Sequence, residues 1–257
     1  MGDDDAAQPV SAAPPGGREA RGGTRVDVRR RRLVTMAAAA ALPATRRADA
    51  SAGTLSVFTF GDSVLDCGHY NEHGVHPGQL LVRNDDRLFP SFRGRDLATR
   101  GPTRLEHRAV DGATVAGLPR QAVGLAAPTG HSVALVTIGG NDLLRGLAGD
   151  DGTGVRAFAE ALDRFLRDLP IRPVLLANVY DPTFGDDARN FLPIDATLAR
   201  ANHRRVNGVI ADLAPAYGRL VDLHGHFLRG DPSWFVHTIE PSLTGASEVR
   251  RAFLQAV

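Results

Sequence analysis

From Leu55 to the C-terminus, the sequence alternates short apolar segments rich in β-forming residues with longer segments of helical periodicity. The first two apolar segments each end at glycine, which is typical of buried strands in a parallel sheet. Strands that alternate with helices of this length are joined by right-handed crossovers, so helices cover both faces of the sheet. The predicted fold class is therefore α/β. The predicted strands span residues 55–60, 132–138, 173–179 and 219–223, and the predicted helices span residues 155–169, 196–213 and 243–256.

Residues 1–53 have a different composition, in which Ala, Gly, Pro, Arg and Asp dominate and no strand or helix period is visible. A segment of this kind cannot bury enough apolar surface to offset its loss of conformational entropy. A disordered tail is therefore predicted over residues 1–53. The remaining residues, 54–257, suffice for one substantial core and are too few for two full domains, so a single domain is expected there.

The predicted tail also carries features of a secretory signal. Arg29 to Arg32 precede an apolar stretch over residues 33–42, and Ala48-Asp49-Ala50 has the small-x-small form of a signal-peptidase site. Against export, the apolar stretch is rich in alanine, and Arg46 and Arg47 stand between it and the proposed cleavage site. A cytoplasmic location is therefore favoured, with export through this N-terminus as the alternative. No segment reaches the roughly 20 apolar residues of a membrane span, so no transmembrane segment is expected.

The residue content excludes several chemistries. A formal net charge of +1 at pH 7 gives no indication of a nucleic-acid partner. The chain has no lysine, which excludes a Ser-Lys dyad, a phosphate-loop lysine and a Schiff base on lysine. Cys67 is the only cysteine, which excludes an intramolecular disulfide and a cysteine-rich metal site. We expect Cys67 to be a buried structural thiol, because no neighbour in the sequence would activate it.

Polar residues follow two predicted strands, at the edge of a parallel sheet where ligands bind. Ser63 follows the first strand in Gly61-Asp62-Ser63, and Asn141 follows the second in Gly139-Gly140-Asn141-Asp142. Between them, Asp111-Gly112 offers a glycine N–H that a ligand can approach closely. Taken singly, these segments could be a helix N-cap, a sharp corner and a turn. Together they meet the needs of acyl transfer: Ser63 as nucleophile, and an oxyanion hole of the Ser63 N–H, the Gly112 N–H and the Asn141 side chain.

The order of these segments resembles the GDSL/SGNH hydrolase family, whose four blocks contribute a serine, a glycine, an asparagine and a histidine. Gly61-Asp62-Ser63 resembles the first block, Asp111-Gly112 the second and Gly139-Gly140-Asn141-Asp142 the third. The resemblance covers about residues 55–257. It implies a flavodoxin-like three-layer α/β/α sandwich with a parallel sheet, and a serine esterase or lipase-like hydrolase acting on small-molecule esters. It also implies that no metal or organic cofactor is needed.

The fourth block departs from the family pattern, Asp-x-x-His-Pro. Here the frame reads His237-Thr238-Ile239-Glu240-Pro241, with histidine in the Asp position and glutamate in the His position. In one interpretation His237 is the general base and Glu240 orients it. In a second, Glu240 is itself the base, with a pKa raised by burial. In a third, His224 or His226 supplies the imidazole, with Asp222 or another carboxylate behind it. The first is favoured, because imidazole titrates near neutral pH and His237 lies in the matching loop.

The other histidines and two aromatic residues receive simpler interpretations. His69, His73 and His76, with Glu72, lie close to Ser63 in the sequence, but their spacing fits no standard metal-ligand pattern. We expect a substrate-facing or solvated loop there. Trp234 and Phe235 are candidates for an acyl pocket or for ordinary core. Surface or helix positions are expected for His107, His131 and His203.

Two other functions fit the same residues. The altered fourth block would allow a degenerate family member that binds an ester or a sugar without turning it over. The same nucleophile would also serve an O-acyltransferase that delivers the acyl group to an alcohol instead of water, and exclusion of water separates these two reactions. Ser63 and Asn141 favour an enzyme, because a binding site has no need of an attacking hydroxyl beside an oxyanion donor.

Overall fold

The computed structural model describes residues 53–257, so the predicted tail and its signal-like features lie outside the described residues. A five-stranded sheet with strand order β2-β1-β3-β4-β5 forms the centre of the described part, and every neighbouring pair is parallel. This is the order of flavodoxin-like folds. The strands are β1 (Leu55–Gly61), β2 (Thr103–His107), β3 (Ser132–Thr137), β4 (Val174–Ala177) and β5 (Gly218–Val221). All four predicted strands are confirmed, and β2 was not predicted.

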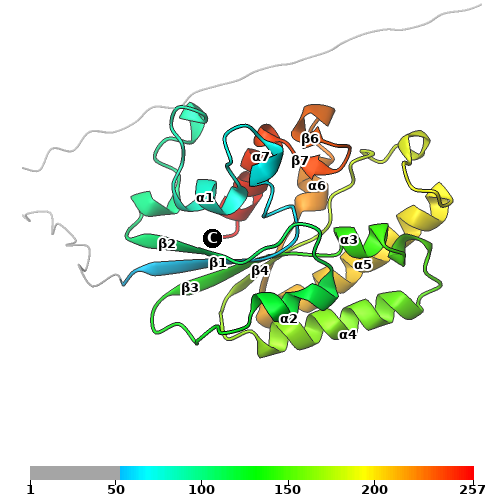
Figure 1. The fold of residues 1–257 in the computed structure, drawn as a ribbon, viewed down its shortest axis with the longest axis horizontal. Coiled ribbons are helices and arrows are strands. Elements are labelled where there is room, and N and C mark those ends of the chain that lie inside the picture. The colour runs from blue at the N-terminus through cyan, green and yellow to red at the C-terminus, as the bar shows by residue number, and fades with distance from the viewer. Residues whose placement is uncertain (1–52) are drawn as a thin grey trace, which may run out of the picture. The chain divides into compact units, whose positions relative to one another are not determined.

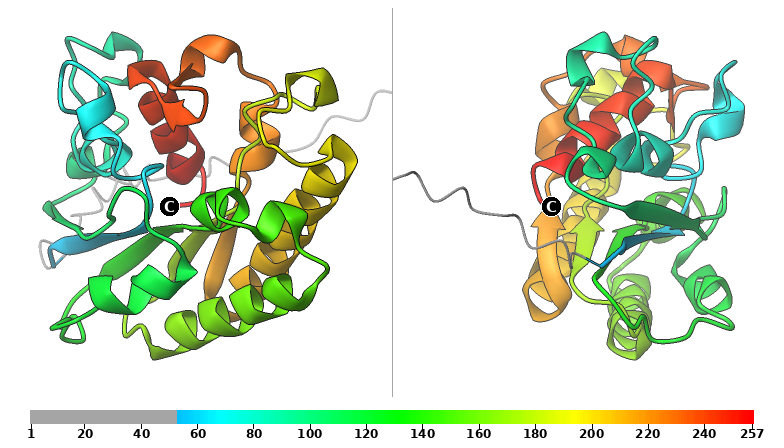
Figure 2. Two further views of the ribbon diagram at one scale, coloured as in Figure 1. Left: turned by 45° about the vertical axis from the view of Figure 1, so that its right-hand side comes forward. Right: turned by 90° about the vertical axis from the view of Figure 1, so that its left-hand side faces the viewer.

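Helices cover both faces of this sheet, as Figures 1 and 2 show. They are α1 (Pro77–Val82), α2 (Leu118–Gln121), α3 (Gly140–Leu144), α4 (Thr153–Asp168), α5 (Ala196–Tyr217), α6 (Leu223–Phe227) and α7 (Leu243–Leu254). Alternate residues along each strand enter two separate cores. Phe58 and Phe60 of β1 pack with α4 and α5, whereas Val57 packs with α1 and α7. The three-layer α/β/α sandwich is therefore confirmed.

The ends of β1 and β3 lie side by side, which brings two candidate segments together. In the register of these strands, Gly61 is opposite Thr137. Gly61 has a φ of +124°, and a Cβ at this position would lie 1.7 Å from the Thr137 carbonyl oxygen. Only glycine fits so close to the neighbouring backbone. The chain then turns sharply out of β1, and the next residues stand at the same edge as the residues that follow β3.

A small antiparallel pair holds the last candidate segment. Strand β6 (Phe235–Val236) pairs with β7 (Glu240–Pro241), with Val236 opposite Glu240. Helix α7 begins directly afterwards, and the Ser242 hydroxyl accepts a hydrogen bond from the Gly245 N–H at its first turn. This pair and helix fix Glu240 relative to the sheet. No helix between residues 53 and 257 combines the length and the apolar character needed to cross a membrane.

Candidate active site

Ser63 lies in the tight turn that follows β1, and the residue is only 7 % exposed to solvent. The Asp62 carbonyl oxygen accepts hydrogen bonds from the N–H groups of Leu65 and Asp66, both at 3.1 Å. The Asp62 carboxylate also closes the turn, because its Oδ1 accepts from the Thr137 hydroxyl at 2.8 Å and from the Val64 N–H at 3.2 Å. The turn is therefore bound to β3 as well as to itself, and it holds Ser63 at the sheet edge.

Asp62 has an unusual protonation equilibrium. Burial raises the pKa of its carboxyl group to about 7, the hydrogen bonds from Thr137 and Val64 lower it, and the charge of Glu240 raises it further. Burial dominates because a carboxylate loses its water shell when the turn folds. The Asp62 carboxyl group therefore retains its proton to a much higher pH than an ordinary aspartate does.

This raised pKa predicts a pH-dependent stability. The folded chain holds the Asp62 proton more tightly than the unfolded chain, so the stabilisation is fully present below about pH 4 and is lost as the pH rises through about 7. Asp62 can account for a decrease of about 4 kcal/mol at most in the free energy of unfolding. In the Asp62→Asn variant the amide oxygen can still accept from Thr137 and Val64, and this part of the pH dependence should disappear. Urea-unfolding free energies of both proteins at pH 5 and pH 8 would measure it, and equal losses in the two proteins would contradict it.

Asn141 occupies the first turn of α3, beyond Gly139, whose φ of +115° turns the chain into the helix. The neighbouring Asp142 carboxylate accepts a hydrogen bond from the Val115 N–H at 3.1 Å. Arg145 donates from Nη2 to the Gly112 carbonyl oxygen at 2.9 Å. The segment after β3 is thus connected twice to the loop that contains Gly112, so these two segments lie together as the sequence predicted.

The Gly112 loop is also connected to the serine turn. The Asp66 carboxylate accepts from the Asp111 N–H at 2.9 Å, and its other oxygen lies 3.2 Å from His107 Nε2. His107 Nδ1 lies 2.7 Å from the Thr59 hydroxyl, so both ring nitrogens have partners. Sequence reasoning expected His107 at the surface or in a helix, whereas it ends β2 and its side chain is only 25 % exposed. This residue helps to hold the first and second segments together.

Glu240 is the fourth-block residue that faces Ser63. It is buried, 9 % exposed, and its Oε2 has no hydrogen-bond partner among residues 53–257. Burial raises the pKa of the Glu240 carboxyl group. The Ser63 side chain lowers it, the Asp111 charge raises it, and the charges of His69 and His237 lower it. The Tyr180 hydroxyl donates to the Ile239 carbonyl oxygen at 2.6 Å, which anchors the backbone next to Glu240. A fixed carboxylate therefore lies against the candidate nucleophile.

His237 lies in the turn between β6 and β7, where it is exposed. Its φ is +48° and that of Thr238 is +73°. The His237 ring centroid lies 5.8 Å from that of Tyr70. The structure thus places Glu240, and not His237, in the cavity that contains Ser63. A catalytic role for His237 stays a prediction.

The third proposed source of a base lies elsewhere. His226 Nε2 is paired with Glu248 Oε2 at 2.9 Å, and the His224 ring lies 5.0 Å from the His203 ring. The Asp222 carboxylate accepts from the Asn178 amide and from the Gly225 N–H, both at 2.9 Å. None of His224, His226 and Asp222 lines the cavity that contains Ser63.

The histidines after Ser63 contact neighbouring side chains. His69 Nε2 lies 3.2 Å from Asp111 Oδ2, which also accepts from the Tyr70 hydroxyl at 2.9 Å. His73 pairs with Glu72, and buried His76 stacks on His107 with ring centroids 4.0 Å apart. Between residues 53 and 257 there is no group of three or more His, Cys, Asp or Glu arranged to hold a metal ion.

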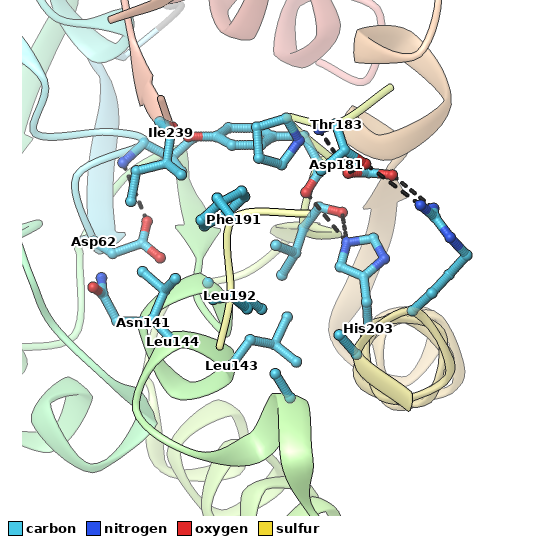
Figure 3. A pocket seen from close by; sticks show the side chains of 18 of the residues that line it. Asp62, Asn141, Leu143, Leu144, Asp181, Thr183, Phe191, Leu192, His203 and Ile239 are labelled. Carbon is cyan, nitrogen blue, oxygen red and sulfur yellow. Dashed lines mark hydrogen bonds and ion pairs between the residues drawn. The ribbon is translucent and has the colours of Figure 1, made fainter. Parts of the chain in front are cut away.

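A cavity of about 130 Å³ opens beside Ser63. Figure 3 shows Asp62 and Asn141 at one end and His203 and Asp181 at the other. Glu240 also lines the cavity, and His237 and Gly112 do not. Sequence reasoning missed this space, because most of its walls come from α3, α5 and the segment after β4. Trp234 and Phe235, considered for an acyl pocket, pack with Phe227 and Tyr180 in the core.

The parallel sheet with helices on both faces and polar groups at its carboxyl edge define an α/β protein of the three-layer class. More specifically, the chain belongs to the GDSL-like lipase/acylhydrolase family, whose sequence model matches residues 59–245. Hydrolysis of esters is therefore its class of reaction. Cys67 is fully buried, as expected from the sequence.

Solved structures share this fold at low sequence identity. An alpha/beta hydrolase enzyme from the metagenome of Lake Arreo, Spain, is 24 % identical with a TM-score of 0.55, over 80 % of this chain and 95 % of that one. A lipase from a goat rumen metagenome is 16 % identical with a TM-score of 0.56, over 79 % and 97 %. An acetylxylan esterase from Geobacillus stearothermophilus is 19 % identical with a TM-score of 0.55, over 80 % and 94 %. A comparison with curated protein sequences found no match.

Proposed function

We propose that this chain hydrolyses carboxylic esters through a covalent acyl intermediate on Ser63, with Glu240 as the general base. The observation that carries the proposal is that the Ser63 side chain and the buried Glu240 carboxylate line the same cavity and interact, while Glu240 Oε2 makes no hydrogen bond to any residue in the described part of the chain. A serine hydroxyl is a weak nucleophile until an adjacent base takes its proton. A carboxylate becomes a stronger base when burial raises its pKa, which is the direction for Glu240.

In this mechanism Glu240 removes the hydroxyl proton as Ser63 Oγ forms a bond to the carbonyl carbon. The electron pair of the C=O bond moves to the carbonyl oxygen. When this intermediate collapses, the bond to the alcohol breaks and the alcohol takes the proton from Glu240. Water then attacks the acyl group on Ser63 with the same help from Glu240, and the carboxylic acid is released.

The developing negative charge on the substrate oxygen would be stabilised by three donors. These are the N–H of Ser63, the N–H of Gly112 and the side-chain amide of Asn141. The loop contacts of Asp142, Arg145 and Asp66 support this assignment, because they fix the segments that carry the donors. Each well-placed donor stabilises the transition state by roughly 3 kcal/mol, because it is oriented before the charge appears.

Labelling of the purified full-length protein with a fluorophosphonate probe tests this proposal. Ser63 Oγ should displace fluoride and form a phosphonate ester, and mass spectrometry of the digested protein should locate the adduct on the peptide that contains Ser63. Heat-denatured protein should not react. An adduct on another residue, or ester hydrolysis without any adduct, would overturn the assignment of Ser63. Absence of both hydrolysis and labelling would instead indicate a binding protein.

A further inference from the structure

The cavity beside Ser63 has an apolar middle section. One end holds the polar groups of the candidate active site, and Figure 3 shows leucine and phenylalanine side chains projecting into the space beyond them. The walls come from α3, from the segment that follows β4 and from the fourth block. The residues of this middle section are Leu143, Leu144, Val179, Phe191, Leu192 and Ile239.

Two of these side chains are exposed although they are large and apolar. Leu144 is 38 % exposed and Phe191 is 41 % exposed. Both line the same cavity, so an apolar ligand in it would cover both. Covering apolar surface is favourable in proportion to the area removed from water. The pair therefore indicates an apolar group of the substrate as the occupant.

The far end of the cavity is polar but already bonded. The Asp181 carboxylate accepts from the Thr183 hydroxyl at 2.6 Å and from Arg200 Nη1 at 2.9 Å, and Arg200 also pairs with Asp187. His203 Nε2 lies 2.9 Å from the Val179 carbonyl oxygen. Because these groups bond to one another and the charge of Arg200 is balanced by carboxylates, the apolar part of the cavity ends at side chains that are already paired. This end limits the length of what the cavity can hold.

We propose that this cavity binds the unbranched acyl chain of the ester, with an optimum near six carbon atoms. The proposal rests on the proposed function, since the carbonyl carbon must lie at Ser63. A volume of about 130 Å³ is comparable to the cavity of about 150 Å³ that holds a benzene molecule of six carbons. The acyl part is the fitting occupant, because the alcohol must leave the site before water can attack the acyl group on Ser63.

Leu144 and Phe191 are then specificity-determining residues. With p-nitrophenyl esters, kcat/KM should rise on the order of tenfold to a hundredfold from acetate to hexanoate, because each buried methylene favours binding by up to about fourfold. It should fall again for dodecanoate. The ratio of hexanoate to acetate activity should drop about tenfold in Leu144→Ala and in Phe191→Ala. Leu228→Ala is the matched control, because Leu228 is 40 % exposed and lies outside the cavity, and its ratio should be that of wild type.

A second measurement does not depend on turnover. The neutral ketone 2-heptanone has the carbon skeleton of a hexanoyl group, and it should bind to Ser63→Ala protein in NMR titrations far more tightly than acetone. Adding Phe191→Ala should weaken that binding about tenfold. Ketone binding without hydrolysis of any ester would refute the proposed function and leave the cavity assignment standing. A flat chain-length profile with no preference for the longer ketone would overturn the cavity assignment and leave the proposed function standing. Activity that rises with alcohol length in a series of alkyl acetates would place the alcohol in the cavity instead, which also overturns it.

Discussion

Ser63→Ala is expected to lower kcat for ester hydrolysis by on the order of 10⁴-fold or more. Without the hydroxyl, no acyl intermediate forms on the chain, and only the oxyanion donors and substrate binding remain to accelerate attack by water. The smaller side chain fits the buried turn, whose hydrogen bonds come from Asp62 and the backbone. Initial rates with p-nitrophenyl hexanoate, together with the midpoint of thermal unfolding, would separate loss of catalysis from loss of folding.

Ser233→Ala provides the control for this experiment. Ser233 is an exposed serine in the turn before β6, and its carbonyl oxygen, which accepts from the Ser242 hydroxyl, is retained in alanine. This variant should keep wild-type rates. Activity left in Ser63→Ala cannot be assigned to Cys67, because that thiol is fully buried and burial raises its pKa to about 12. A Ser63→Ala variant within tenfold of wild type would show that another residue is the nucleophile.

The fold was predictable from sequence where strands are buried on both sides. β1, β3 and β4 are almost entirely buried, so their residues form continuous apolar runs. β2 was missed because it is an edge strand that pairs only with β1, and its residues Thr103 to His107 are polar or only half-buried. A strand with one neighbour and a partly solvated surface has little apolar pattern. The long helices α4 and α5 were recognisable, whereas the short helices α1 to α3 have too few turns for a period.

The candidate site was predictable only in part, for a similar reason. Ser63 and Asn141 follow strands whose ends must meet in a parallel sheet, so their common location followed from the fold. The fourth block has no such constraint. Which side chain faces inward depends on the β6–β7 pair and on the positive φ values of His237 and Thr238 between them. These backbone conformations are unusual for residues other than glycine, and no local sequence pattern predicts them.

Contacts between segments far apart in the sequence could not be predicted either. His203 was assigned to a helix, which is correct, but its position beside the cavity depends on how α5 packs against the segment after β4. His107 was assigned to the surface or a helix, because its partners Thr59 and Asp66 are each more than 40 residues away. Such contacts follow from tertiary packing, whereas sequence spacing describes only what neighbours along one helix or strand can do.

Glu240→Gln is expected to lower kcat on the order of 10³-fold. The amide has nearly the shape of the carboxylate and cannot take the proton of Ser63. In the wild type, the pKa of the Glu240 carboxyl group is raised by burial, so activity should be complete above that raised pKa and should be lost as the pH falls through it. His237→Ala should cost less than tenfold. Because His237 lowers the pKa of Glu240, its removal should move the acid limb of the pH profile to higher pH.

Initial rates from pH 4 to pH 9 with the same hexanoate ester would test both variants, and Glu160→Gln, on the exposed side of α4, is the matched control for loss of a carboxylate. An inactive His237→Ala beside an active Glu240→Gln would make the histidine the base, as the sequence pattern favoured, and would require the β6–β7 turn to rearrange when substrate binds. If both variants remain active while His224→Ala or His226→Ala is inactive, the base comes from the segment after β5. Loss of activity in Glu240→Gln alone, with an unchanged unfolding midpoint, would leave the carboxylate that contacts Ser63 as the group that accepts its proton.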